Sequence, residues 1–209
     1  MSNIKIGRMV VGAVQTNCYF LQNTDTNEVV VVDPGAKGER IYEELTSRGY
    51  TIKAVLLTHG HFDHVMGADA IRKAADVKVY LGELDGKLIE NADLNVSAMF
   101  GTPYTMKADI LVKDGEEFEL AGIKMKVIHT PGHTAGGVCY YLEEEKILVC
   151  GDTLFAESVG RTDFPTSSSR DLVTAIRKKL FTLPEDVYVY PGHGPTTTIG
   201  YEKENNPFV

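Results

Sequence analysis

The chain has no tryptophan, only three cysteines and no long apolar run, and its basic side chains are outnumbered by acidic ones. No apolar stretch approaches the roughly 18 residues of a membrane-spanning helix, and residues 1–5 do not begin a signal-peptide core. Lys and Arg number 21 against 29 Asp and Glu, a formal charge of −8 with no basic run. We therefore expect a cytoplasmic protein with no membrane partner and no nucleic-acid partner.

The three cysteines are Cys18, Cys139 and Cys150, an odd number at wide spacing and each inside an apolar run. This pattern predicts buried, reduced thiols and no disulfide framework. Cys150 stands two residues before Asp152, and residues i and i+2 of a strand share a face. A weak role beside a metal is therefore the alternative for this one thiol.

A chain of 209 residues with 43% hydrophobic residues and no linker or repeat predicts a single domain over residues 1–209. Hydrophobic periodicity indicates two successive sets of strands and helices, as in two β-sheets packed together and flanked by helices. The segment 83–107 is the least regular and could form a flap. The expected strands lie within 4–33 and at 53–57, 77–81, 116–120, 123–128, 137–142, 146–150 and 187–190; the expected helices are 38–48, 63–75 and 169–181.

The segment 58–64, Thr-His-Gly-His-Phe-Asp-His, places His59, His61, Asp63 and His64 within six positions, directly after the apolar run 54–57. A loop that follows a buried strand is held by a rigid scaffold, and catalytic groups often lie on such loops. Histidine and aspartate are ligands that suit zinc and similar divalent metals. The segment therefore predicts a metal site at the end of a strand.

Three further candidate ligands, His133, Asp152 and His193, each follow an apolar or β-rich run and stand beside a glycine. The runs indicate strands and the glycines indicate the turns after them. Five of the six histidines fall in these motifs, which a random scatter would not produce. Four strand ends should therefore converge on one site.

Seven ligands exceed what one tetrahedral zinc takes and suit two divalent ions, zinc first, with iron and manganese as alternatives. The expected first ion takes His59, His61 and His133, the second takes Asp63, His64 and His193, and Asp152 bridges both. Such a pair of ions lies about 3.5–4 Å apart and can generate a hydroxide nucleophile at neutral pH. This chemistry is typical of hydrolases.

These motifs resemble those of the metallo-β-lactamase superfamily and, within it, the glyoxalase II branch (hydroxyacylglutathione hydrolases), above all its short, single-domain bacterial members. The resemblance runs from about Asn17 to the C-terminus. It implies an αββα sandwich, no separate C-terminal substrate-binding domain, and hydrolysis of a small thioester such as S-lactoylglutathione by a metal-bridging hydroxide, with Asp63 and Asp152 as catalytic residues. The motifs are His59-x-His61-x-Asp63-His64, Gly132-His133-Thr134, Gly151-Asp152-Thr153-Leu154-Phe155 and Gly192-His193-Gly194.

The resemblance also implies a substrate-binding role for Arg161, because glyoxalase II enzymes carry a basic residue there that contacts glutathione. Two residues later those enzymes tend to carry an aromatic hydroxyl, where this chain has Asp163. Arg161 could hold a substrate carboxylate through two hydrogen bonds. A solvated or structural arginine is the alternative.

Other activities remain open at this point. Persulfide dioxygenases resemble the chain in the segment 160–164 and would bind one iron through His59, His133 and Asp152, but Gly192-His193-Gly194 favours the hydrolases. A lactonase or weak β-lactamase is a further alternative, and a non-catalytic metal-binding or partner-binding protein is another.

Two polar residues near the motifs are not expected to bind metal. His129 fits no motif spacing, so a structural role, or a hydrogen bond to a ligand, is expected. Asp33 precedes Pro34-Gly35. A turn-forming aspartate is the favoured interpretation, and support of the metal-binding loop is the alternative.

Overall fold

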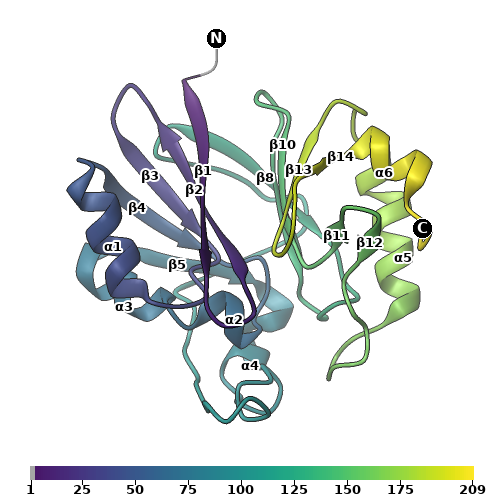
Figure 1. The fold of residues 1–209 in the computed structure, drawn as a ribbon, viewed down its shortest axis with the longest axis horizontal. Helices are drawn as coiled ribbons and strands as arrows, with labels where there is room; N and C mark the ends of the chain where they lie inside the picture. The colour runs from purple at the N-terminus through teal and green to yellow at the C-terminus, as the bar shows by residue number, and fades with distance from the viewer. Residues whose placement is uncertain (1–2) are drawn as a thin grey trace.

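The computed structural model describes residues 3–209, which form two facing β-sheets with helices on the outer side of each (Figure 1). This arrangement confirms the expected αββα sandwich. The first sheet has the order β1 (Ile4–Val11), β2 (Thr16–Asn23), β3 (Glu28–Val32), β4 (Thr51–Leu56), β5 (Lys78–Gly82) and β6 (Ile110–Val112). The second has the order β14 (Thr197–Thr198), β13 (Tyr188–Pro191), β10 (Ile147–Gly151), β9 (Val138–Leu142), β8 (Ile123–His129) and β7 (Glu117–Leu120).

Both sheets are mixed. In the first, β1, β2 and β3 pair antiparallel and β3 to β6 pair parallel; in the second, the antiparallel strands β7 to β10 are joined by the parallel pair β10–β13. The run of valines in β3 shows why the inner strands are continuously apolar. Val29 and Val31 pack toward the helices, whereas Val30 and Val32 pack between the sheets. A strand that is buried on both faces needs apolar side chains at every position.

The helices are amphipathic and lie on the outer faces. Helix α1 (Gly38–Ser47) buries Ile41 and Leu45 against the first sheet, and α5 (Ser169–Lys178) buries Leu172 and Ile176 against the second. The Ser168 hydroxyl accepts the Asp171 N–H at 3.3 Å and so caps the N-terminus of α5. Within residues 3–209, no helix is long and apolar enough to cross a membrane.

One expected element differs in form, because the helix predicted over 63–75 is two helices, α2 (Phe62–Val65) and α3 (Ala68–Ala75). Gly67 separates them. Its N–H donates to the Pro34 carbonyl at 2.7 Å, and a Cβ at this position would lie 2.5 Å from the same oxygen. The loop after β3 therefore interrupts the helix.

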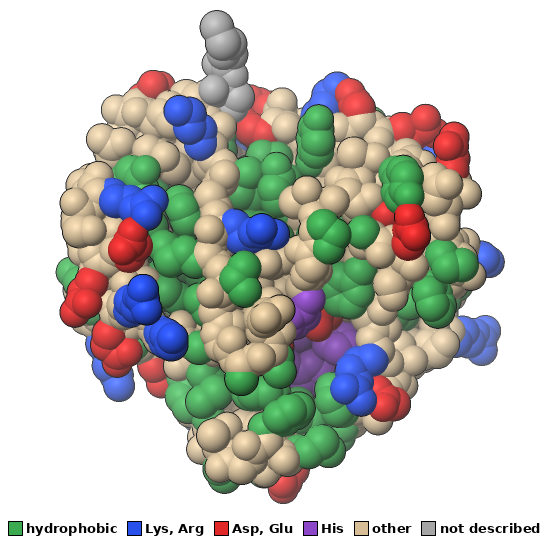
Figure 2. All heavy atoms as spheres, viewed as in Figure 1, with side chains coloured by type: hydrophobic (Ala, Val, Ile, Leu, Met, Phe, Trp, Pro, Cys, Tyr) green, Lys and Arg blue, Asp and Glu red, His purple; other side chains and the backbone are tan. Residues whose placement is uncertain are grey.

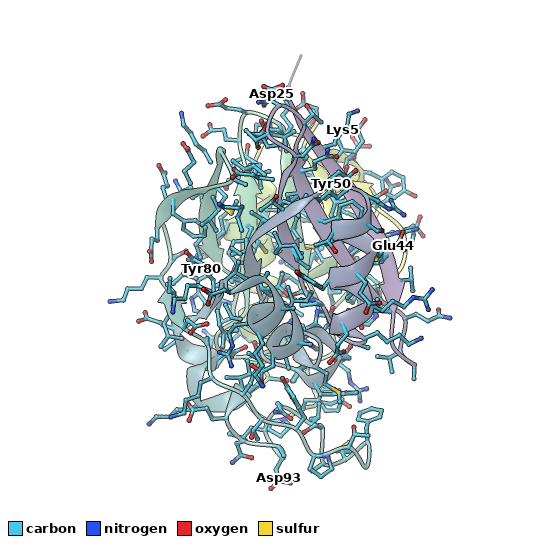
Figure 3. All side chains as sticks on the ribbon, turned by 90° about the vertical axis from the view of Figure 1, so that its left-hand side faces the viewer. Lys5, Asp25, Glu44, Tyr50, Tyr80 and Asp93 are labelled. Atoms are coloured by element: carbon cyan, nitrogen blue, oxygen red, sulfur yellow. The ribbon has the colours of Figure 1, made fainter. Side chains whose placement is uncertain are left out.

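The elements that sequence analysis did not predict are short or carry little periodicity. They are β6, β14, the hairpin strands β11 (Leu154–Phe155) and β12 (Ser158–Val159), α4 (Gly86–Ile89), α6 (Ile199–Asn205) and the 3₁₀ turns η1 (Glu83–Asp85) and η2 (Leu180–Thr182). Helix α6 buries only Ile199 and Glu202, so it has no apolar stripe. The irregular segment around α4 forms one pole of the molecule, with Asp93 at its tip and Asp25 at the opposite pole (Figure 3).

The three cysteines are buried free thiols, as expected. Burial raises the pKa of all three, that of Cys139 to about 11. The Cys150 thiol packs in the core beneath α5 and donates to the Leu154 carbonyl at 3.2 Å. The residue after it, Gly151, has a φ of +50°, so the strand ends there and Asp152 does not share the face of Cys150. This geometry does not support the alternative of a metal role for Cys150.

Candidate metal centre

The seven predicted side chains converge between the two sheets at one end of the sandwich. His59, His61, Asp63 and His64 follow β4 of the first sheet, whereas His133, Asp152 and His193 follow β8, β10 and β13 of the second. The histidines lie at the floor of a hollow in the surface, with hydrophobic side chains beside it (Figure 2). His59, His61, His64 and His133 are buried. Both sheets therefore contribute to one site.

The polar atoms fall into two triads. One triad is His59, His61 and His133, the other is Asp63, His64 and His193, and in each the nearest potential ligand atoms lie within 4.8 Å of one another. A third group of the same kind, His59, His64 and Asp152, takes one histidine from each triad. The two triads contain the same residues as the two groups expected from the sequence.

Asp152 lies between the triads. Its Oδ2 is 3.6 Å from His133 Nε2 in one triad, and its Oδ1 is 3.5 Å from His64 Nε2 in the other. A single carboxylate is therefore within reach of both groups, as a bridging ligand requires.

Hydrogen bonds outside the centre fix the orientation of three imidazole rings. Nδ1 of His59 contacts Thr58 Oγ1 at 3.1 Å, Nδ1 of His64 contacts Asp33 Oδ2 at 3.0 Å, and Nδ1 of His133 contacts the Arg161 carbonyl at 2.8 Å. A carboxylate or carbonyl oxygen can only accept, and the Thr58 hydroxyl already donates to Asp33 at 2.7 Å. Each Nδ1 is therefore the donor, which leaves the Nε2 lone pair directed at the centre.

The donor atoms fit divalent cations. Among residues 3–209, the buried atoms without a hydrogen-bond partner include Nε2 of His59, His61 and His64 and Oδ1 of Asp152. His61 Nδ1 and His133 Nε2 are 2.9 Å apart, and His133 Nε2 can only accept in this contact when its Nδ1 donates to Arg161. Buried polar atoms are seldom left unpaired. Several of them around one point are what a bound metal ion would satisfy.

The two triads differ in electrostatics. Burial, and then the neighbouring histidines, lower the pKa of His59 and His61, which favours the neutral imidazole that a metal needs. In the second triad burial lowers the pKa of His64, but Asp63, Asp152 and Asp33 outweigh burial and raise it to about 10. The second triad therefore has the stronger attraction for a positive charge.

Asp33 supports the metal-binding loop, so the favoured interpretation of a simple turn residue was wrong. Its Oδ1 accepts the Thr58 N–H at 2.8 Å, and its Oδ2 accepts both the Thr58 hydroxyl and His64 Nδ1–H. The backbone does turn here, with a φ of +51°. The side chain, however, reaches across to the end of β4 because β3 and β4 are parallel neighbours.

Sequence analysis missed Asp85, which connects two of the loops. Its buried carboxylate accepts the Gly60 N–H at 2.9 Å, the Thr134 hydroxyl at 2.8 Å and the Gly136 N–H at 2.7 Å. The loop of His59 and the loop of His133 are thus fixed to one side chain. Asp85 lies in the irregular segment after β5, where no motif or periodicity marks it.

The loop of His193 is held by residues of β2, which sequence analysis also missed. Asn17 Nδ2 donates to the carbonyls of Pro191 and Gly194 at 2.9 and 3.0 Å, and the Tyr19 hydroxyl donates to Pro191 at 2.8 Å. Thr16 donates to Asp63 Oδ2 at 3.2 Å. The first sheet therefore positions ligand candidates of the second.

Arg161 lies beside the candidate site, whereas His129 lies outside it. Arg161 lies exposed at the rim of the hollow and pairs with Asp163, while its carbonyl accepts from His133. His129 is no candidate ligand, as expected. Its Nε2 contacts the Ala135 carbonyl at 2.8 Å and steadies the turn that carries His133, without bonding to any of the seven residues.

Comparison with known proteins gives the family. The profile of the metallo-beta-lactamase superfamily matches residues 11–193. The chain belongs to this superfamily. It therefore shares the superfamily architecture, and its His and Asp cluster suits divalent metals.

Two curated superfamily relatives match over nearly the full length. The chain is 38% identical to the probable metallo-hydrolase YqgX of Bacillus subtilis, over 99% of this chain and 98% of the relative. It is 34% identical to the hydroxyacylglutathione hydrolase GloC of Haemophilus influenzae, again over 99% and 98%.

Two solved structures of the superfamily are also similar. The BLEG-1 B3 metallo-beta-lactamase has a TM-score of 0.93 at 39% identity, covering 98% of this chain and 99% of that one. TTHA1623 in a di-iron-bound form has a TM-score of 0.85 at 35% identity, covering 97% and 100%.

Proposed function

We propose that this superfamily member is a metal-dependent hydrolase that cleaves small thioesters of the glyoxalase II type, with S-lactoylglutathione as the first candidate. The observation that carries the proposal is the convergence of two complete His and Asp triads joined by Asp152. The similarity to the hydroxyacylglutathione hydrolase GloC over nearly the whole chain supports the thioester.

Two divalent ions would be held by the residues of the two triads, with Asp152 shared. When bound, the ions supply a nucleophilic hydroxide at neutral pH and polarise the substrate carbonyl. We propose zinc, with iron or manganese as alternatives, because these ligands accept all three and the relative TTHA1623 binds two irons.

The chain's own residues position the reaction. Asp63 Oδ2 accepts from Thr16 at 3.2 Å and lies 3.2 Å from His193 Nε2, so a carboxylate is fixed where it can orient the attacking water. His59, His64 and His133 are held by their Nδ1 hydrogen bonds, so their Nε2 atoms need no reorientation. A thiol leaving group has a pKa of about 8.5 and leaves as the thiolate, so no general acid is required.

We further propose that the chain is one domain, that it acts in the cytoplasm, where its free buried thiols stay reduced, and that its partner is a small-molecule substrate. Arg161 is the proposed substrate-binding residue at the rim of the hollow.

The decisive test is Asp152→Ala. We expect the variant to lose at least one metal equivalent and at least 10³-fold of kcat/KM for S-D-lactoylglutathione, because the residue shared by both triads is removed. Metal content and steady-state thioester hydrolysis are measured on the same preparation. The matched control is Asp25→Ala, because Asp25 lies at the end of the molecule opposite Asp93 (Figure 3). Full activity in Asp152→Ala would contradict the proposal.

A second candidate is β-lactam hydrolysis, because the BLEG-1 B3 metallo-beta-lactamase is 39% identical. A chromogenic cephalosporin in the same assay distinguishes the two activities. A single-iron dioxygenase is less favoured, because the second triad of Asp63, His64 and His193 is complete.

A further inference from the structure

The cavity above the metal centre has mostly apolar walls. It has a volume of about 360 Å³, and its apolar lining consists of Val14, Phe62, Val96, Phe100, Phe155, Val159 and Phe164. Phe62 and Phe100 stack with their ring centroids 4.6 Å apart. The apolar surface continues outward, because Phe100 is 49% exposed and the adjacent Met99 is 70% exposed.

Val96 occupies this wall in a strained conformation. Its φ is +59°, in the left-handed region that a β-branched residue rarely adopts. Glycine or asparagine would relieve the strain but would remove the apolar side chain. Strained residues of this kind concentrate at functional sites, where the surrounding structure holds them in place. A valine at this position therefore keeps the wall apolar, although its backbone conformation costs free energy.

The basic side chain beside the cavity is already paired with a carboxylate. Arg161 is the one Lys or Arg among the lining residues within 3–209. Its Nε and Nη2 donate to the two carboxylate oxygens of Asp163, each at 2.7 Å, and its Cζ lies 3.9 Å from the centre of the Phe164 ring. The nearby Arg8 does not line the cavity and donates to the Gly194 carbonyl. The charge of Arg161 is therefore paired with that of Asp163, and its guanidinium adds flat, stacked surface to the wall.

We infer that the substrate is a thioester whose thiol part is apolar and uncharged. This part binds against the wall of Phe62, Val96 and Phe100. The inference rests on the proposed thioester hydrolysis and narrows its substrate class. A carboxylate placed against this wall, away from the metal centre, would lose hydration, and the nearby Arg161 is already paired with Asp163. An apolar group would gain from burial there, as in most small-molecule sites.

The test compares two D-lactoyl thioesters that share the acyl group, S-D-lactoylglutathione and the thioester of benzyl mercaptan. Rates are divided by the alkaline hydrolysis rate of each ester, which removes the difference in leaving group. We expect a normalised kcat/KM at least tenfold higher for the benzyl ester. An equal or higher value for the glutathione ester would overturn this inference and leave the proposed function intact. Hydrolysis of neither ester would instead refute the proposed function.

Variants of the wall and of the rim make the comparison specific. Phe100→Ser should lower kcat/KM about tenfold for the benzyl ester and less than twofold for the glutathione ester. Phe208→Ser is the matched control, because Phe208 is a similarly exposed aromatic residue, at 56%, outside the cavity lining. Asp163→Asn frees the Arg161 guanidinium and should raise kcat/KM several-fold for the glutathione ester alone. Equal losses for both esters in Phe100→Ser would overturn the inference.

Discussion

Single carboxylates around the centre orient several groups at once. Asp33 receives hydrogen bonds from the backbone and hydroxyl of Thr58 and from the ring of His64, and it is almost fully buried. Through Thr58 it also fixes the ring of His59. One side chain therefore sets the orientation of a candidate ligand in each triad, although it lies in neither.

Asp33→Asn should weaken metal binding about 10–100-fold. The amide NH₂ would replace the oxygen that accepts from His64 Nδ1, so His64 would have to move its proton to Nε2, the atom directed at the metal. Competition with a chromogenic chelator measures the affinity, and Asp25→Asn, on the exposed turn after β2, serves as control. Unchanged affinity in Asp33→Asn would refute the orienting role.

The three thiols should be inert in the folded protein. The thiolate is the reactive form, and burial raises the pKa of each thiol, so little thiolate forms at pH 8. We expect less than about 0.1 equivalent to react with a disulfide reagent within an hour, and three equivalents after denaturation. One thiol that reacts at once in the native protein would contradict the buried placement, above all at Cys150.

For single residues, the sequence predicts candidate ligands that stand together in one motif. It misses residues whose hydrogen-bond partners are distant in the sequence. His59, His61, Asp63 and His64 are recognisable because four potential ligands stand within six positions. Asp85 is equally central, yet the three groups that donate to its carboxylate are brought together only by the fold. An isolated aspartate in an irregular segment has no sequence pattern that distinguishes it from a solvated one.

The candidate ligands lie on the loops that follow the strands. In these loops the backbone packs closely against neighbouring residues. The loop after β13 packs directly on the centre, because a Cβ on Gly192 would lie 2.2 Å from Asp152 Oδ1 and 2.6 Å from His64 Cε1. The glycine beside each of His133, Asp152 and His193 was predicted as a turn residue. At Gly192 the structure shows that space, rather than a turn, demands it.

Gly192→Ala should reduce the proposed thioesterase activity by more than 100-fold and release metal, because the methyl group would displace Asp152 and His64. Gly194→Ala is the matched control on the other side of His193. Its Cβ would meet no atom within 4 Å, although its φ of +75° would lower the stability by about 1 kcal/mol. Metal content and urea denaturation are measured for both variants. Wild-type metal content in Gly192→Ala would contradict the prediction, because it would show that Asp152 and His64 can make room for the methyl group.

Long periodic elements were predictable and short ones were not. Helices α1 and α5 were found from their apolar spacing, and the strands β7, β8, β9 and β10 were expected at 116–120, 123–128, 137–142 and 146–150. The two-residue strands β11, β12 and β14 are too short for a period, and Gly67 interrupts an otherwise helical pattern through its contact with Pro34. Such contacts depend on the tertiary structure, which local propensity does not contain.

In the whole molecule, the centre joins the two sheets. The first sheet supplies His59, His61, Asp63 and His64, and the second supplies His133, Asp152 and His193, so each triad contains residues of both. Periodicity indicated two packed sheets flanked by helices, and the resemblance to the superfamily implied the αββα sandwich. The seven-residue cluster followed from the strand ends, because ligands at the ends of packed sheets meet at one edge.

Metal removal should therefore destabilise the whole molecule rather than one loop. Ions bound only by the folded state stabilise it by about 2.7 kcal/mol at a free concentration 100 times Kd. For a chain of this length, about 1 kcal/mol shifts Tm by roughly 2–4 °C, so chelation should lower Tm by about 5–10 °C. Calorimetry with and without chelator measures the shift in the wild type and in Asp152→Ala. A large shift in the wild type and a much smaller one in the variant are expected, because only the wild type has the residue shared by both triads. Equal Tm values with and without chelator in the wild type would mean that the sheets hold the cluster without metal.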